Sequence, residues 1–380
     1  MYEVNHEELK KLIEIHYKKK TPLFIYGSFG LGKSWVVRET AKKIAEEKGK
    51  KFIEWNKISA KEKQELTENM KGKFLFYDET ASQILPEDLR GLPSFNNSHK
   101  EYVEWKPNLV FTAFSKPDAD GIIFFDELNL ASTLVTTSLF KVFQNKAVGE
   151  VSLNQEIGII GAGNLHSDKS SVFDLPAPLR DRMSEVQLQV PSYEQFSNWC
   201  LKNRVDARIV AFINARKSIH HRVDEEGINK ATTPRGMERL SHLIEGIQDH
   251  DEIRLIASST VGEATALEFS KFLQMERKID VEKILQNPKL IKELPERELD
   301  LRYSLLSSIT AYYQSKKEKK ARIEILKQVV VMCKYLETEF SVLLLRMLKG
   351  VDVDFFIREI QIIPEAREIM KEYLNYLIDW

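Results

Sequence analysis

The chain has 380 residues, of which 43% are hydrophobic and 30% are charged, a balance that excludes a disordered protein and predicts two or three globular domains. With 56 basic and 57 acidic residues the formal net charge is −1, so no global positive field draws the chain onto nucleic acid or an anionic membrane. Two distant cysteines, Cys200 and Cys333, exclude a disulfide framework, and the lack of a signal-like start or of an apolar run of about 18 residues predicts a cytoplasmic protein without a membrane span.

Helices and strands are expected to alternate in the first half of the chain. Apolar residues recur at helical spacing over residues 7–20 and 34–48. Short apolar runs at 23–26, 73–77, 121–125 and 157–161 predict strands. Because these runs are apolar on both faces, we expect a parallel sheet that is sandwiched by helices.

Strand-like runs largely disappear after about residue 190, and residues 192–219, 234–247 and 251–272 are predicted to be helical. Two further apolar stripes each predict one helix face: Leu305, Leu306, Ile309 and Tyr313, then Leu326, Val330, Cys333, Leu336, Phe340, Leu343 and Met347. We therefore expect an α/β core over 1–190, a helical lid over 191–280 and a C-terminal helical extension over 281–380.

A glycine-rich turn is predicted to bind nucleotide phosphates. The run Gly27, Ser28, Phe29, Gly30, Leu31, Gly32, Lys33 and Ser34 fits G-x-x-x-x-G-K-[ST]. A predicted strand precedes the run and a predicted helix follows it, and Trp35, the next residue of that helix, is also expected to contact the nucleotide. The glycines let backbone N–H groups point at phosphate oxygens, and the helix start adds a positive end. Lys33 is expected to reach the β- and γ-phosphates and Ser34 to ligate Mg²⁺.

A carboxylate pair follows the apolar run at 121–125. Asp126 and Glu127 would both lie at the carboxyl edge of the sheet, where ligands of α/β proteins bind. We expect Asp126 to hold Mg²⁺ through water and Glu127 to polarise the attacking water. Together with the glycine-rich turn, this pair predicts a P-loop ATPase.

Four further stretches carry a resemblance to a known family. Residues 83–93 (QILPEDLRGLP), 121–130 (GIIFFDELNL), 160–164 (IGAGN) and 175–183 (LPAPLRDRM) resemble the motifs of MoxR-like AAA+ ATPases, in the clade with an insert in the second helix. The resemblance covers roughly residues 21–272. It implies ATP as the nucleotide, Mg²⁺ as its metal, and an AAA+ core with a lid.

The resemblance also implies roles for polar residues beyond the two motifs. Asn164 would be the sensor 1 residue that positions water or contacts the γ-phosphate. Arg182 would be the arginine finger that reaches a neighbouring subunit, with Arg180 as the alternative, and Met183 stands where the family usually has phenylalanine. Arg235, in the run TTPRG at 232–236, would be the sensor 2 residue of the lid.

Finally, the resemblance implies an assembly and a class of partner. Residues 94–111 fall where the helix insert belongs, and residues 147–153 resemble the hairpin before sensor 1. The family resemblance implies a homo-oligomeric ring, expected to be a hexamer, that remodels or matures a protein client in the manner of a chaperone, often one with a von Willebrand factor A domain. The alternatives are a nucleic-acid motor or defence-complex ATPase, for which lysine runs at 18–20 and 316–320 are the candidate contacts, and a slow nucleotide-gated switch.

Overall fold

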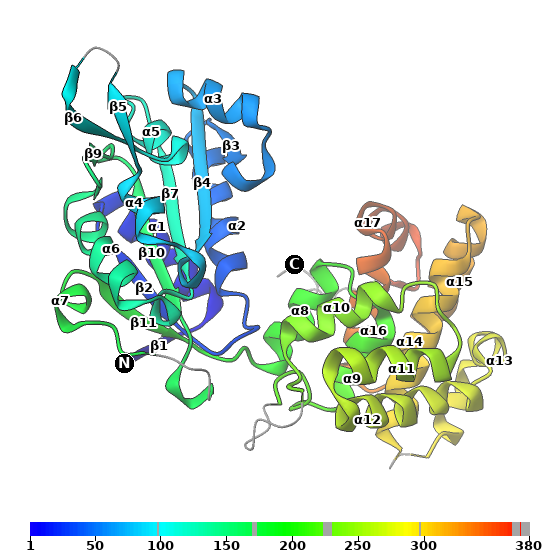
Figure 1. Ribbon diagram of the computed structural model, residues 1–380. Helices are drawn as coiled ribbons and strands as arrows, with labels where there is room; N and C mark the ends of the chain where they lie inside the picture. Colours follow the sequence, from blue (N-terminus) through cyan, green and yellow to red (C-terminus); the bar gives the residue numbers. More distant parts are fainter. Residues whose placement is uncertain (97–98, 169–172, 223–229, 296–297, 367–372, 374–380) are drawn as a thin grey trace. The chain divides into compact units, whose positions relative to one another are not determined.

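The computed structural model describes residues 1–96, 99–168, 173–222, 230–295, 298–366 and 373, with residues 95–96 and 99–102 described by their backbone alone. The chain forms two compact units, Met1–Val190 and Pro191–Trp380. The first unit is α/β and the second is helical, as the colours of Figure 1 show. No helix in the described parts of the chain is long and apolar enough to cross a membrane.

A parallel sheet forms the centre of the first unit. Its strand order is β1-β11-β2-β10-β7-β4-β3. The strands are β1 Tyr2–Val4, β11 Ser184–Leu188, β2 Leu23–Tyr26, β10 Gly158–Gly163, β7 Gly121–Asp126, β4 Lys73–Thr80 and β3 Lys51–Glu54. All neighbouring pairs run parallel, so the carboxyl ends of the strands share one edge.

Two apolar cores cover the two faces of this sheet. On one face pack α1 (His6–Lys19) and α2 (Lys33–Glu47), and on the other α3 (Ala60–Glu68), α5 (Leu109–Phe114) and α6 (Thr133–Asn145). Along β7, Ile122 and Phe124 enter the first core while Ile123 and Phe125 enter the second. Successive side chains of a strand point to opposite faces, so a strand buried on both faces is apolar at every position.

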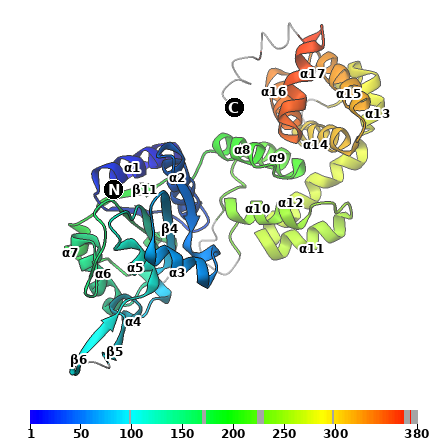
Figure 2. The same cartoon turned by 90° about the horizontal axis from the view of Figure 1, so that it is seen from above.

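Short elements connect the sheet to its helices. They are η1 Trp55–Lys57, η2 Ala81–Gln83, α4 Pro86–Arg90, η3 Leu128–Leu130, η4 His166–Asp168 and α7 Ala177–Arg180. The unit also contains two antiparallel hairpins. One pairs β5 (Leu92–Asn96) with β6 (His99–Lys106), and the other pairs β8 (Ala147–Val148) with β9 (Val151–Ser152). The β5–β6 hairpin extends away from the sheet in both views (Figures 1 and 2). The hairpins occupy the segments predicted for the helix insert and for the hairpin before sensor 1.

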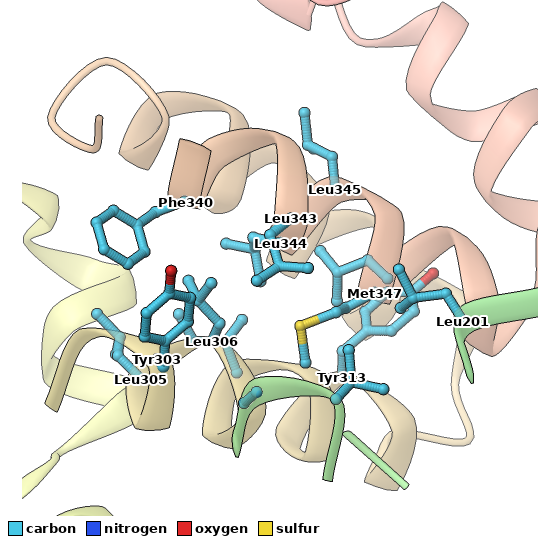
Figure 3. Packing of buried hydrophobic residues seen from close by; sticks show 14 of the residues in the cluster. Leu201, Tyr303, Leu305, Leu306, Tyr313, Phe340, Leu343, Leu344, Leu345 and Met347 are labelled. Carbon is cyan, nitrogen blue, oxygen red and sulfur yellow. The ribbon is translucent and has the colours of Figure 1, made fainter. Parts of the chain in front are cut away.

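The second unit is built from helices around α14. The elements are α8 Tyr193–Lys202, α9 Ala207–Ala215, α10 Pro234–Leu243, α11 His250–Val261, α12 Glu263–Gln274, η5 Met275–Lys278, α13 Val281–Gln286, η6 Pro288–Glu293, α14 Leu299–Ser315, α15 Lys319–Met332, α16 Thr338–Val351 and α17 Val353–Ile362. Tyr303 and Leu306 of α14 face Phe340 of α16 in the core (Figure 3). Helices before and after residue 280 contribute to this one core. The division into a lid over 191–280 and an extension over 281–380 stays a prediction.

The predicted fold class, a parallel sheet between helices followed by an all-helical half, is confirmed. Several boundaries were wrong. The helix expected over 251–272 is two helices, because Gly262 takes φ 87°, a left-handed value that ends α11. The apolar stripe expected on one helix over 326–347 lies on two, since α15 ends at Met332 and α16 begins at Thr338. The short strands β1, β3 and β11 were not predicted.

Candidate nucleotide-binding site

The turn between β2 and α2 has the backbone that phosphate binding requires. Gly30 and Gly32 take φ values of 75° and 86°, which side-chain-bearing residues rarely adopt. Gly32 is the N-cap of α2, so no side chain caps the helix and its first N–H groups are left to other acceptors. His6 Nε2 lies 2.8 Å from the Leu31 carbonyl oxygen and supports the turn from α1. The residues between Tyr26 and Lys33 therefore form a cradle for an anion.

The other residues of this segment divide between the core and the surface. Leu31 is buried in the core between the sheet and α1, whereas Phe29 is exposed. Trp35 is half-buried on α2, and the Lys10 ammonium lies 5.6 Å from its ring centroid. Trp35 and Phe29 remain predicted nucleotide contacts.

The Lys33 side chain is buried and lies across the turn. Its Nζ donates to the carbonyls of Gly27 (2.6 Å) and Ser28 (3.1 Å) and to Asn164 Oδ1 (3.1 Å). An ammonium held among these oxygens lies beside the turn, at the position from which a lysine reaches terminal phosphates. The residues present thus fit a nucleoside triphosphate.

Ser34 and Asp126 meet although they are far apart in the sequence. The Ser34 hydroxyl donates to Asp126 Oδ2 at 2.6 Å, and Asp126 Oδ1 accepts from the backbone N–H of Glu127 at 2.9 Å. Hydroxyl and carboxylate oxygens are the ligands Mg²⁺ prefers, with water and phosphate oxygens completing the shell. No group of three or more His, Cys, Asp or Glu side chains among the described residues could hold a metal alone. The pair fits a metal that arrives with a nucleotide.

Glu127 stands in an unusual backbone conformation. Its φ is 54°, in the left-handed region that a glutamate rarely occupies. The Ser82 hydroxyl, from η2 beyond β4, donates to Glu127 Oε2 at 2.8 Å. The half-buried carboxylate is therefore held beside Asp126 and turned away from the regular course of the strand.

A second acidic strand end lies beside the first. β4 pairs with β7 so that Thr80 is opposite Asp126, which brings Asp78 near the Asp126 carboxylate. Burial, followed by the negative charge of Asp126, raises the pKa of Asp78 to about 6. An uncompensated acid at this edge favours an arriving cation.

Asn164 follows β10, the strand that lies between β2 and β7. The buried Asn129 side chain clamps it from both sides: Nδ2 donates to the Asn164 carbonyl (2.8 Å) and Oδ1 accepts from the Asn164 N–H (3.1 Å). Gly163 makes this possible, because a Cβ there would lie 2.4 Å from Asn129 Oδ1. The clamp fixes the backbone from which the Asn164 amide reaches Lys33.

An aspartate on the segment after Asn164 also contacts the turn. The buried Ser28 hydroxyl donates to Asp168 Oδ1 at 2.8 Å, while Asp168 Oδ2 is buried and has no hydrogen-bond partner in the part of the chain that the structure describes. Gly27 N–H donates to the Gly163 carbonyl at 3.2 Å. The turn and the strand end that carries Asn164 are thus joined at two points.

The two candidate finger arginines have different partners. Arg180 forms two hydrogen bonds of 2.8 Å to Glu185, a bidentate pair on the surface. Arg182 Nη1 donates to the Pro178 carbonyl, and its Nε has no hydrogen-bond partner among the described residues. Within its own chain neither guanidinium bonds a described residue of the turn at 27–34.

Arg235 belongs to the second unit. Thr233 caps α10 by accepting from the Gly236 N–H at 3.1 Å, and Pro234 occupies the first turn, which leaves Arg235 exposed at the helix start. Its predicted role toward the nucleotide stays a prediction.

Sequence reasoning missed four residues of this site: Ser82, Asp78, Asn129 and Asp168. Only Asp78 carried a usable signal, because it follows the predicted strand at 73–77 just as Asp126 follows the strand at 121–125. The others are single polar residues whose partners lie 35 to 140 positions away.

Comparisons with known proteins give distant structural similarities. No family model matches the sequence, and no curated protein matches it. The fold is similar to a RuvB mutant of Thermotoga maritima (13% identity, 80% of each chain, TM-score 0.35). It is also similar to NtrX of Brucella abortus (16% identity, 91% of this chain and 67% of that one, TM-score 0.36) and to a DNA polymerase III gamma subunit-related protein of Thermotoga maritima (11%, 96% and 99%, TM-score 0.31). Similarities this weak carry no functional argument, which rests on the site itself.

Proposed function

We propose that this chain is an Mg²⁺-dependent ATPase of the AAA+ class. One observation carries the proposal: Lys33 reaches Asn164 while the adjacent Ser34 reaches Asp126. The groups that would bind phosphates, hold the metal and contact the reacting phosphoryl group therefore converge at one edge of the sheet. A structural salt bridge or a surface turn would not need all of them together.

The chain's own side chains support a hydrolytic step. Lys33 and the N–H groups of α2 bind and orient the β- and γ-phosphates. Ser34 and Asp126 would hold Mg²⁺, which would supply positive charge to the phosphate oxygens. Glu127 accepts a proton from a water molecule while the oxygen of that water bonds to the γ-phosphorus. The bond between the γ-phosphorus and the β-phosphate oxygen breaks, and ADP leaves. Asn164 holds that water or the γ-phosphate in line.

Assembly is part of the proposal because an arginine finger acts from a neighbouring copy. Arg182 is the better candidate, since Arg180 is already occupied by Glu185. A finger acting in trans implies a homo-oligomer, proposed as a hexameric ring, whose activity depends on assembly. Arg235 would act on the nucleotide from the helical unit.

The finer proposal is a MoxR-type remodelling ATPase. It rests on the sequence motifs, and its proposed client is a folded protein, possibly one with a von Willebrand factor A domain. The β5–β6 hairpin, which extends from the sheet, is the proposed contact with such a client (Figure 2).

A trapping experiment tests this proposal. Glu127→Gln keeps the size of the side chain and the phosphate-binding turn but removes the proton acceptor, so the ATP-bound assembly should persist on its client. Proteins and nucleic acids that copurify from the native cell with this variant would be identified, with Lys33→Ala as the control. A folded protein client supports remodelling. Nuclease-sensitive DNA or RNA, absent from the control, would instead support the nucleic-acid motor.

A further inference from the structure

A second cavity lies at the opposite edge of the sheet from the nucleotide site. Its volume is about 330 Å³, and it opens where β4 and β7 begin and where α2 ends. Three lysines line it, Lys48, Lys50 and Lys71. The cavity is large enough for a phosphate group and a small organic substituent.

Two of these lysines are held in place by one buried carboxylate. Asp120 is 1% exposed, and its Oδ2 accepts from Lys48 Nζ at 2.5 Å and from Lys50 Nζ at 2.7 Å. Tyr17 donates to the other oxygen and also accepts from Lys48 at 2.7 Å. Burial alone would raise the pKa of Asp120, but the hydrogen bonds from Lys48, Lys50 and Tyr17 lower it below its usual value.

Some ammonium N–H groups of these lysines have no acceptor among the described residues. A lysine ammonium has three N–H groups; the Asp120 and Tyr17 contacts use two of those on Lys48 and one on Lys50. Lys71 is exposed on the wall; its backbone N–H donates to Asn69 Oδ1 at 2.9 Å, and its Nζ forms no hydrogen bond to a described residue. Because Lys48 and Lys50 share one carboxylate, each keeps an N–H group that these contacts do not use.

Two further carboxylates, Glu156 and Asp118, line the cavity. Glu156 pairs with Lys20, whose Nζ lies 2.9 Å from Glu156 Oε2. Asp118 is exposed at the rim. Three lysines and three carboxylates line the cavity, and two of these carboxylates are already engaged, Asp120 by Lys48 and Lys50 and Glu156 by Lys20.

The cavity is separate from the phosphate-binding turn. Lys33 opens α2, and Lys48 follows its last residue, Glu47. At 1.5 Å per residue, the 15 residues of α2 place the two sites about 22 Å apart. A ligand in the cavity would not touch the nucleotide.

We propose that this cavity binds a small phosphate-type oxyanion, either free phosphate or a phosphate ester. Lys48 and Lys50 would contact it with charge-assisted hydrogen bonds from positions already fixed by Asp120, which reduces the entropy lost on binding. Lys71 would close the contact from the rim. The proposal is independent of the ATPase assignment.

Calorimetric titration of the full chain tests the proposal. The Lys33→Ala variant serves as the background, so that phosphate does not bind at the turn. Inorganic phosphate and glycerol 3-phosphate are the two probes, and acetate at matched ionic strength is the planar, singly charged control. The test variants are Lys50→Gln and Lys71→Gln in this background. Lys43→Gln is the matched control, because Lys43 lies on α2 near the cavity end of that helix but pairs with Glu14 and does not line the cavity.

We expect one phosphate site per chain, weakened at least about tenfold by either test variant and unchanged by Lys43→Gln. Tighter binding of glycerol 3-phosphate would identify the ligand as an ester, whereas equal or weaker binding would identify free phosphate. Lys71→Gln leaves the Asp120 cluster intact, so it remains informative if Lys50→Gln does not fold. The absence of saturable phosphate binding, or equal affinity in Lys71→Gln and Lys43→Gln, overturns the proposal.

Discussion

The Asn129→Ala variant should show whether Asn129 positions Asn164 for catalysis or only stabilises the fold. Asn129 is 2% exposed, and its side chain makes two hydrogen bonds to the backbone of Asn164. Removing both leaves an N–H and a carbonyl without partners, which should cost about 2–3 kcal/mol of unfolding free energy. The Asn164 amide then loses its fixed position beside Lys33.

The catalytic effect should be larger than the stability effect alone would give. A displacement of about 1 Å in a positioning group lowers turnover by up to about 100-fold. We therefore expect kcat for ATP to fall on the order of 10- to 100-fold while KM changes little, because Lys33 and the turn remain. Steady-state ATPase assays below the melting temperature, together with urea unfolding, measure the two effects separately.

Asn154 provides a matched control at the opposite edge of the sheet. Its side chain also bridges backbone groups, donating to the Lys116 carbonyl (2.9 Å) and the Pro117 carbonyl (2.6 Å) and accepting from the Glu156 N–H (2.8 Å). Asn154→Ala should lose comparable stability and keep its kcat. If the two variants lose stability equally and also lose turnover equally, the positioning argument for Asn129 is refuted.

Three further predictions concern the metal, the finger and an acidic neighbour. Ser34→Ala should raise the Mg²⁺ concentration needed for half-maximal ATPase activity, because it removes the hydroxyl that meets Asp126; an unchanged Mg²⁺ titration would contradict the assignment. Arg182→Ala should abolish turnover but keep ATP binding, and mixing it with Lys33→Ala should restore activity, whereas Arg180→Ala, which breaks only a surface pair, should stay active. Asp78→Asn should stabilise the fold above about pH 6 and not at pH 4. The pKa of Asp78 is raised to about 6 in the folded protein, so ionisation of this side chain lowers the unfolding free energy as the pH rises through that value. Urea unfolding midpoints measured between pH 4 and pH 7 give the difference.

The phosphate-binding turn and the carboxylate pair could be predicted from the sequence because each is a local pattern. Positions of the turn that take a left-handed backbone conformation favour glycine, as Gly30 and Gly32 show, so the glycines recur at fixed spacing in the sequence. A strand buried on both faces must be apolar throughout, and the polar residue that ends it is conspicuous, as Asp126 is. The strands β2, β4, β7 and β10 were found for the same reason.

Contacts that join distant segments could not be predicted in this way. Ser82 reaches Glu127 only because η2 follows β4, the neighbour of β7. The cluster around Asp120 needs α1, the end of α2 and the start of β7 to meet. The edge strand β3 was missed because it has only four residues and most of them are partly exposed, which weakens the apolar pattern.

The central claim is that ATP is bound and hydrolysed at the edge of the sheet where Lys33, Ser34, Asp126 and Asn164 meet. Its most direct test compares ATP binding with single-turnover hydrolysis in the wild type, Lys33→Ala and Glu127→Gln. We expect binding and turnover in the wild type, neither in Lys33→Ala, and binding without turnover in Glu127→Gln. Hydrolysis that persists in Lys33→Ala, or a wild type that binds no ATP in the presence of Mg²⁺, would contradict it.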